Sequence, residues 1–188
     1  TLADQSGVQY LFVPELDDMY PVKPVSTTIN VAGLSEGLEG KSRPTHFGGV
    51  ATVVAKLFSI VGPSTAYFGE KDYQQLLVIK RMVVDLLLPV RVIGCPTIRE
   101  ADGLAMSSRN SYLKPKERGA AATLFKALKV GTRAIADGIR EPALVVAGMV
   151  SVLSDEPLIE IDYVDVVDAD SLITPSVLRG DVRLMLAA

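Results

Sequence analysis

A lysine and two acidic residues stand between an apolar run and a segment of helical periodicity, in the string GEKDYQQ at 69–75. In open α/β sheets such a turn lies at the carboxyl end of a strand, where ligands bind. The first N–H groups of the following helix have no intrahelical partner, and a lysine beside them suits a phosphate group. Lys71 is therefore the first candidate for a phosphate-binding side chain.

A second polar string, GLAMSSRN at 103–110, follows the next strand-like run. Ser107 and Ser108 offer hydroxyl donors and Arg109 a planar guanidinium, which together match the several oxygens of a triphosphate. Singly, each of these residues is better explained as an ordinary surface or turn residue. Jointly, on loops at one sheet edge, they favour phosphate binding. The chain contains neither G-x-x-x-x-G-K-[ST] nor G-x-G-x-x-G, so neither a P-loop nor a dinucleotide fold is predicted.

The elements that must position these strings follow from periodicity and turn residues. Short apolar runs predict buried parallel strands at 8–13, 65–69 and 90–94. Apolar residues at three-and-four spacing predict helices over 45–61 and 72–86. Helices that alternate with parallel strands are typical of α/β folds, and we expect two crossover units.

The pattern changes after residue 97. Alanine-rich segments predict helices over 116–138 and 141–156. Alternating apolar and polar residues over 158–167 predict a strand with one face exposed to solvent, and the apolar run at 181–188 is also strand-like. We expect two domains: a Rossmann-like α/β domain at 1–97, then a smaller α+β domain at 98–188 that carries the serine and arginine string.

Composition narrows the class of protein. The 188 residues are 48% hydrophobic with a net charge of −3, so we expect no nucleic-acid partner. The chain has no apolar run long enough to span a bilayer and no signal-peptide pattern, so we expect a cytoplasmic protein away from membranes. The single cysteine, Cys95, is expected to be a buried, inert thiol. The start at Thr1 and the apolar end predict that both ends are cut.

Three strings in order, RPTHFGGV (43–50), FGEKDYQQ (68–75) and DGLAMSSRN (102–110), resemble the pantothenate synthetase (pantoate–beta-alanine ligase) family. The resemblance implies a class I nucleotidylyl-transferase fold, of which this chain holds only part of the first domain. It also implies an ATP-dependent reaction: pantoate forms a pantoyl adenylate and pyrophosphate, and beta-alanine then displaces AMP. Mg²⁺ is implied as well, with its acidic ligands upstream.

The resemblance assigns site residues by matching position. Those that match the family's ATP contacts are Gly69, Glu70, Lys71, Asp72, Ile98, Met106, Ser107, Ser108 and Arg109. Those that match its pantoate contacts are Gln75, Val50, Val53 and Val54. The catalytic roles fall to Lys71, Ser107, Ser108 and Arg109.

The sole histidine, His46, is interpreted as a structural residue at a helix start. In the resembled family the catalytic histidines lie in an HxGH motif, which is absent from this sequence. We therefore expect the chain to be a fragment that lacks the amino-terminal part, and to be inactive when isolated.

Other interpretations remain open at this point. Within the enzyme class, the alternative is another class I nucleotidylyl transferase. Outside it, the alternatives are a nucleotide-binding fragment without catalysis and a structural or dimerising piece. The half-polar string VSTTINV (25–31) predicts a short strand that could pair across the two-fold axis of a homodimer.

Overall fold

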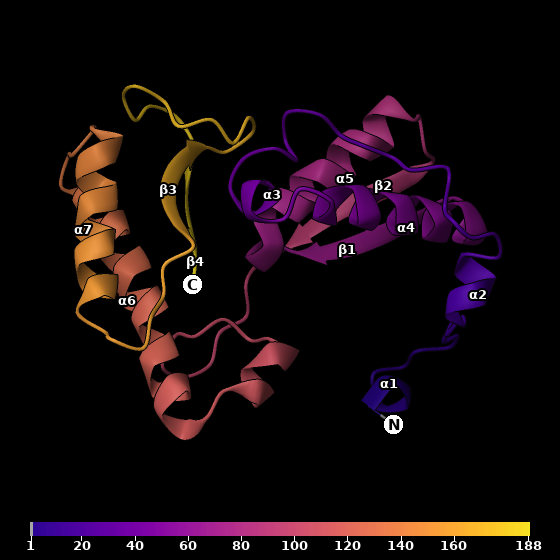
Figure 1. Cartoon of the computed structure of the whole chain (residues 1–188), viewed down its shortest axis with the longest axis horizontal. Helices are drawn as coiled ribbons and strands as arrows, with labels where there is room; N and C mark the ends of the chain where they lie inside the picture. Colours follow the sequence, from indigo (N-terminus) through magenta and orange to yellow (C-terminus); the bar gives the residue numbers. More distant parts are fainter. Residues whose placement is uncertain (1) are drawn as a thin grey trace.

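Two parallel strands and the helix that joins them form the centre of the amino-terminal half (Figure 1). The computed structural model describes residues 2–188. Strand β1 (Ser64–Gly69) pairs with β2 (Val90–Cys95) in a register that runs from Ser64 opposite Val90 to Gly69 opposite Cys95. Parallel strands need a crossover connection, which α5 (Tyr73–Asp85) supplies. The two strands therefore end side by side.

Helix α4 (His46–Val61) packs against α5 and ends at Gly62, whose φ of 77° suits a residue without a Cβ. Both helices lie within one residue of their predicted bounds. Buried apolar side chains from the helices, β2 and a preceding loop form one core: Val31, Phe47, Ala51, Ala55, Phe58, Val78, Ile79, Met82 and Val90.

The carboxyl-terminal half pairs two helices with an antiparallel sheet. Helix α6 (Pro115–Ala136) packs against α7 (Pro142–Ser154), and β3 (Tyr163–Asp168) pairs with β4 (Val182–Ala187). The close contact of the helices requires a glycine, because a Cβ on Gly131 would lie 2.6 Å from Met149 Sδ. A second core forms here from Ala127, Val145, Met149, Leu153, Val166 and Leu178.

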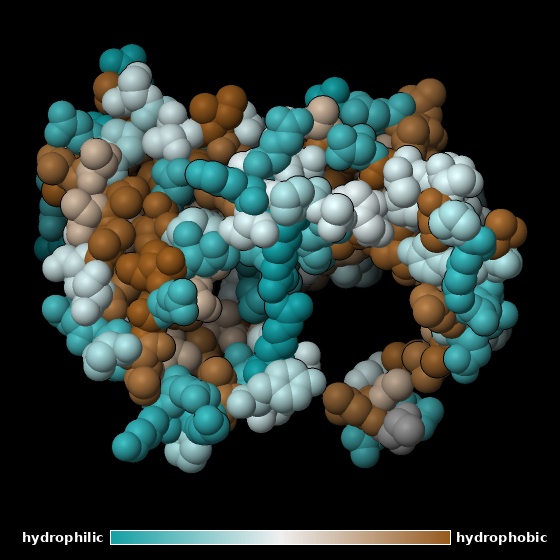
Figure 2. All heavy atoms as spheres, viewed as in Figure 1, coloured by the Kyte–Doolittle hydropathy of each residue, from teal (hydrophilic) through white to brown (hydrophobic). Residues whose placement is uncertain are grey.

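The amino-terminal segment differs from the prediction. Residues 8–13 form no strand, and Tyr10, Leu11 and Val13 are at least 73% exposed. Figure 2 shows hydrophobic atoms, in brown, along the segment between the short helices α1 (Leu2–Gln5) and α2 (Leu16–Met19). A strand needs a hydrogen-bonded neighbouring strand, and no described residue forms a β-bridge with residues 8–13. The expected second crossover unit is therefore absent from the described residues.

Three smaller expectations were also wrong. Residues 25–31 form no strand; the N–H of Ile29 instead donates to Thr52 Oγ1 at 2.9 Å, so a side chain occupies that donor. The strand expected from residue 158 begins at Tyr163. The consecutive residues Val166 and Val167 point to opposite faces and are both buried, so neither face of the strand is fully exposed to solvent. Cys95 is half-buried at the end of β2 rather than buried. No helix among residues 2–188 has the length and apolar character to cross a membrane.

Candidate functional site

The turn that carries Lys71 lies at the carboxyl end of β1. Gly69 ends the strand, a one-turn 3-10 helix η1 (Glu70–Asp72) follows, and α5 begins at Tyr73. The exposed Lys71 Nζ lies 3.1 Å from Asp72 Oδ1. An exposed ion pair of this kind contributes little free energy, so the ammonium group remains available to an incoming anion.

The second predicted segment leaves the neighbouring strand. After β2 the chain folds into a narrow loop in which Arg99 bridges to Ala105 and the N–H of Met106 donates to the Ile98 carbonyl oxygen at 2.9 Å. This bond brings Ile98 and Met106 together, although their side chains are 66% and 52% exposed. Two adjacent exposed apolar side chains offer a surface for a flat ring.

The loop is attached to α6 by two contacts. Arg118 binds Asp102 through two hydrogen bonds of 2.6 and 3.2 Å, and the Arg99 guanidinium lies 4.4 Å from the centre of the Phe125 ring. The Arg118 hydrogen bond lowers the pKa of Asp102, and the same bond raises the pKa of Arg118. Gly103, at φ 93°, lies so close to Phe125 that a Cβ there would overlap the ring.

The serine and arginine segment begins a further 3-10 helix, η2 (Ser108–Tyr112). Ser107 Oγ accepts from the N–H of Arg109 at 3.2 Å, and Asn110 Nδ2 donates to the Ala105 carbonyl oxygen at 3.0 Å. The side chains of Ser108 and Arg109 are exposed. Within residues 2–188, no hydrogen bond or ion pair joins this segment to the Lys71 turn; Figure 1 shows the chain between β2 and α6 extending away from the first sheet. The two segments therefore face solvent separately.

The residues predicted to contact pantoate lie on α4 and α5. Val50, Val53 and Val54 are half-buried, and two of them, Val50 and Val54, pack against the first core. Gln75 is half-buried in the first turn of α5. The His46 ring lies edge-on to Phe47, with ring centres 5.0 Å apart.

Gln74 is a buried residue that the sequence interpretation missed. Only 4% of its surface is exposed, and its Nε2 donates to the carbonyl oxygens of Leu34 and Gly37 at 2.9 and 2.8 Å. Its Oε1 is buried and has no hydrogen-bond partner among the described residues. The available signal was helical spacing, because Gln74 lies four residues before the buried Val78.

Tyr163, at the start of β3, was also missed. Burial raises its pKa to about 12, and the charges of Glu39, Asp162 and Asp72 act in the same direction. Nearby, Ser42 Oγ donates to Asp162 Oδ1 at 2.7 Å. Carboxylates from both halves of the chain therefore disfavour the ionised form of this phenol.

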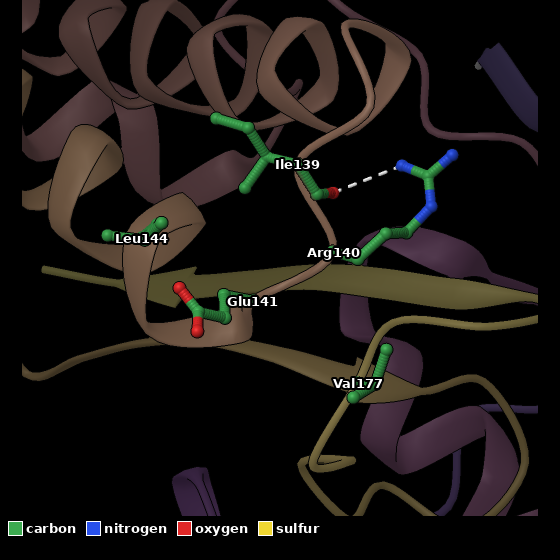
Figure 3. Close-up of a pocket in the computed structure, with 5 residues that line it drawn as sticks. All are labelled: Ile139, Arg140, Glu141, Leu144 and Val177. Atoms are coloured by element: carbon green, nitrogen blue, oxygen red, sulfur yellow. Dashed lines mark hydrogen bonds between the residues drawn. The ribbon is translucent and has the colours of Figure 1, made fainter.

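None of the predicted site residues lines the hollows on the carboxyl-terminal half. One hollow of about 270 Å³ is lined by Ile139, Arg140, Glu141, Leu144 and Val177 (Figure 3). The guanidinium of Arg140 in this hollow is hydrogen-bonded to the backbone: its Nη1 donates to the carbonyl oxygens of Ile135 and Ile139 at 2.7 and 3.1 Å. A larger hollow of about 590 Å³ lies along α6.

The fold and this site define a partial nucleotidylyl-transferase-type α/β domain followed by a small sheet domain. The family model described as pantoate-beta-alanine ligase matches residues 1–188, and the chain belongs to that family.

Relatives and solved structures agree with this membership. The chain is 51% identical to a pantothenate synthetase of Moorella thermoacetica, covering 99% of this chain and 65% of that protein. It is 50% identical to one of Rhizobium etli, with coverage of 97% and 61%. The chain thus spans less than two thirds of the length of these relatives.

Among solved structures, the pantothenate synthetase of Thermus thermophilus superposes with a TM-score of 0.94 at 44% identity, covering 98% of this chain and 67% of that one. The pantoate-beta-alanine ligase of Francisella tularensis, complexed with beta-gamma ATP and beta-alanine, superposes with a TM-score of 0.70 at 33% identity. It covers 87% of this chain and 58% of that one.

Proposed function

We propose that this chain is part of an AMP-forming ligase that joins pantoate to beta-alanine, with ATP as the third substrate. The observation that carries the proposal is the Lys71 turn, which lies at the carboxyl end of β1 directly beside the end of β2. Family membership supplies the reaction, and the Francisella relative has been solved with an ATP species and beta-alanine.

The proposed chemistry has two displacement steps. A carboxylate oxygen of pantoate attacks the α-phosphorus of ATP, and the bond to pyrophosphate breaks. The amine of beta-alanine then attacks the acyl carbon, loses a proton, and expels AMP as the C–O bond breaks. Lys71 stabilises the charge that develops on the phosphates, because a preorganised cation is most effective where charge appears during the reaction.

The remaining residues bind and orient the substrates. Arg109 provides paired donors to phosphate oxygens, with the hydroxyls of Ser107 and Ser108 beside it. The other proposed nucleotide contacts are Gly69, Glu70, Asp72, Ile98 and Met106. The proposed pantoate contacts are Gln75, Val50, Val53 and Val54.

Magnesium enters the proposal only as the ion that accompanies ATP. Residues 2–188 contain no group of three or more His, Cys, Asp or Glu side chains that could hold a metal ion. We assign no step of the proposed reaction to the metal.

Two organisational features belong to the same proposal. The division near residue 97 into two domains is supported by the two separate hydrophobic cores. We also propose a homodimer. Residues 25–31 form no strand, so this proposal does not depend on pairing of that segment as a strand; it rests on the exposure of the segment, in which Val25 is 43% exposed.

The test is isotope exchange between pyrophosphate and ATP, catalysed by the full-length protein. The adenylate mechanism predicts exchange that requires pantoate and proceeds without beta-alanine. Exchange that is absent with pantoate, or that responds to another carboxylic acid instead, would contradict the proposal.

A further inference from the structure

The two residues that bracket Lys71 and Asp72 are both in contact with Arg183, which lies more than a hundred positions further along the chain. Arg183 Nη2 lies 3.6 Å from Glu70 Oε2, and its guanidinium carbon lies 4.5 Å from the centre of the Tyr73 ring. We propose that Arg183 is a positioning residue, through which the β3–β4 sheet holds the turn that presents Lys71. This inference rests on the proposed function, in which Lys71 contacts the phosphates of ATP.

The turn has little local structure of its own. Helix η1 is a single 3-10 turn of three residues, and such turns have weaker hydrogen-bond geometry than an α-helix. Asp72 joins η1 to α5 with φ −99° and ψ 61°, outside the helical range, and no side chain caps either helix. The position of Lys71 therefore depends on what holds Glu70 and Tyr73.

The second sheet holds Tyr73 at two points. Its ring contacts Arg183 on β4, and its hydroxyl donates to the carbonyl oxygen of Ala169 at 2.9 Å. Ala169 follows β3 directly, and its N–H donates to the Asp181 carbonyl oxygen just before β4. The two contact points thus belong to neighbouring ends of one hydrogen-bonded strand pair.

Arginine suits this place better than lysine. A planar guanidinium can stack on an aromatic ring and still direct N–H groups at a carboxylate, whereas an ammonium group is a compact point charge. Arg183 is 43% exposed and its charge is offset by Glu70, so its long-range field at the phosphates is small. Its effect should therefore be geometric, and small displacements of catalytic groups have large effects on rate.

The test compares three variants of the full-length ligase with the wild type: Arg183→Met, Arg183→Lys and the control Arg179→Met. Arg179 is an exposed arginine four residues upstream, so its replacement removes the same charge from the same region. Hydrogen exchange is measured without substrates on the peptide that covers residues 70–78. We expect exchange to be about fivefold to tenfold faster in Arg183→Met, as contacts of this strength imply. Arg183→Lys should resemble it, and the control should match the wild type.

Kinetics supply the second measurement. In pantoate-dependent pyrophosphate exchange, Arg183→Met should lower kcat about tenfold and leave both KM values within about twofold, because it misplaces a group that acts in the transition state. Equal effects from Arg179→Met would overturn the assignment. So would an unchanged exchange rate over 70–78 in a folded Arg183→Met protein.

A variant that fails to fold does not end the test. Tyr73→Phe keeps the ring and removes only the bond to Ala169, and it should also accelerate exchange over 70–78 while the melting temperature stays near that of the wild type. If Tyr73→Phe and Arg183→Lys both exchange as the wild type does, the inference is wrong. Hydrogen exchange is measured without turnover. A wild-type enzyme without pantoate-dependent activity would therefore refute the proposed function, while the exchange comparison would still test the role of Arg183.

Discussion

The buried amide of Gln74 allows a quantitative test of what holds the loop at 34–37 against α5. Its Nε2 donates to two carbonyl oxygens at 2.9 and 2.8 Å, while its Oε1 has no partner among residues 2–188. Gln74→Met keeps the size and removes both donors. Each lost hydrogen bond costs about 1 kcal/mol, and removal of the unpaired oxygen returns a similar amount, so we expect a net loss of about 1 kcal/mol.

Gln74→Glu should behave differently. An ionised carboxylate would face the same two carbonyl oxygens with no proton to donate, and we expect a loss of about 3 kcal/mol or more near pH 8. The neutral acid can donate to one carbonyl, so the folded state should favour it and raise the pKa of the introduced carboxyl above its unfolded value of about 4.3. Stability relative to Gln74→Met should then be greatest below about pH 4.3 and fall as the pH rises through the folded pKa.

Denaturant unfolding of the full-length variants at a series of pH values measures this difference. The Gln74→Met protein is the matched control, because it has no titratable group at the position. A Gln74→Glu variant as stable as the wild type at pH 8, or a pH-independent gap between the two variants, would show that the amide does not make these bonds.

Four further outcomes are expected. Lys71→Ala should slow adenylate formation by about 10²-fold or more with the fold intact, and a near-normal single-turnover rate would refute its role. Arg109→Ala should weaken ATP binding more than pantoate binding, because a guanidinium pairs with phosphate oxygens; calorimetry showing equal losses would indicate a structural arginine. Asp102→Asn should destabilise the protein at neutral pH, and because its partner Arg118 lowers the Asp102 pKa, that deficit should disappear as the pH falls below about 3.9 through the folded value; a deficit that persists at low pH would argue against the ion pair as its cause. Light scattering of the full-length protein should give a dimer mass at micromolar concentration, and a monomer would end the dimer proposal.

The sequence predicted the elements whose signal is local. Helices α4 and α5 were placed within one residue at each end because three-and-four apolar spacing and a glycine at the end of α4 mark them. The turn with Lys71 followed from the strand before it and the helix after it. Residues 8–13 were wrong because an apolar run indicates a tendency to be buried, whereas a strand also requires a neighbour.

The contacts around the turn could not be predicted in the same way. Gln74 binds carbonyl groups about forty positions upstream, and Arg183 contacts Glu70 from beyond a hundred positions downstream. Neither pairing leaves a local pattern, because each depends on how the loop and the second sheet pack against α5. Gln75, its neighbour, was proposed as a pantoate contact only through resemblance to a family.

The most direct test of the central claim uses pantoate labelled with oxygen-18 in its carboxylate. The full-length protein is incubated with labelled pantoate, ATP and beta-alanine, and the products are analysed by mass spectrometry. An adenylate intermediate predicts one labelled oxygen in AMP and one in pantothenate, because the attacking carboxylate oxygen stays on the α-phosphorus when the amine displaces AMP. Label in inorganic phosphate with ADP as the second product, or AMP without label, would contradict the account.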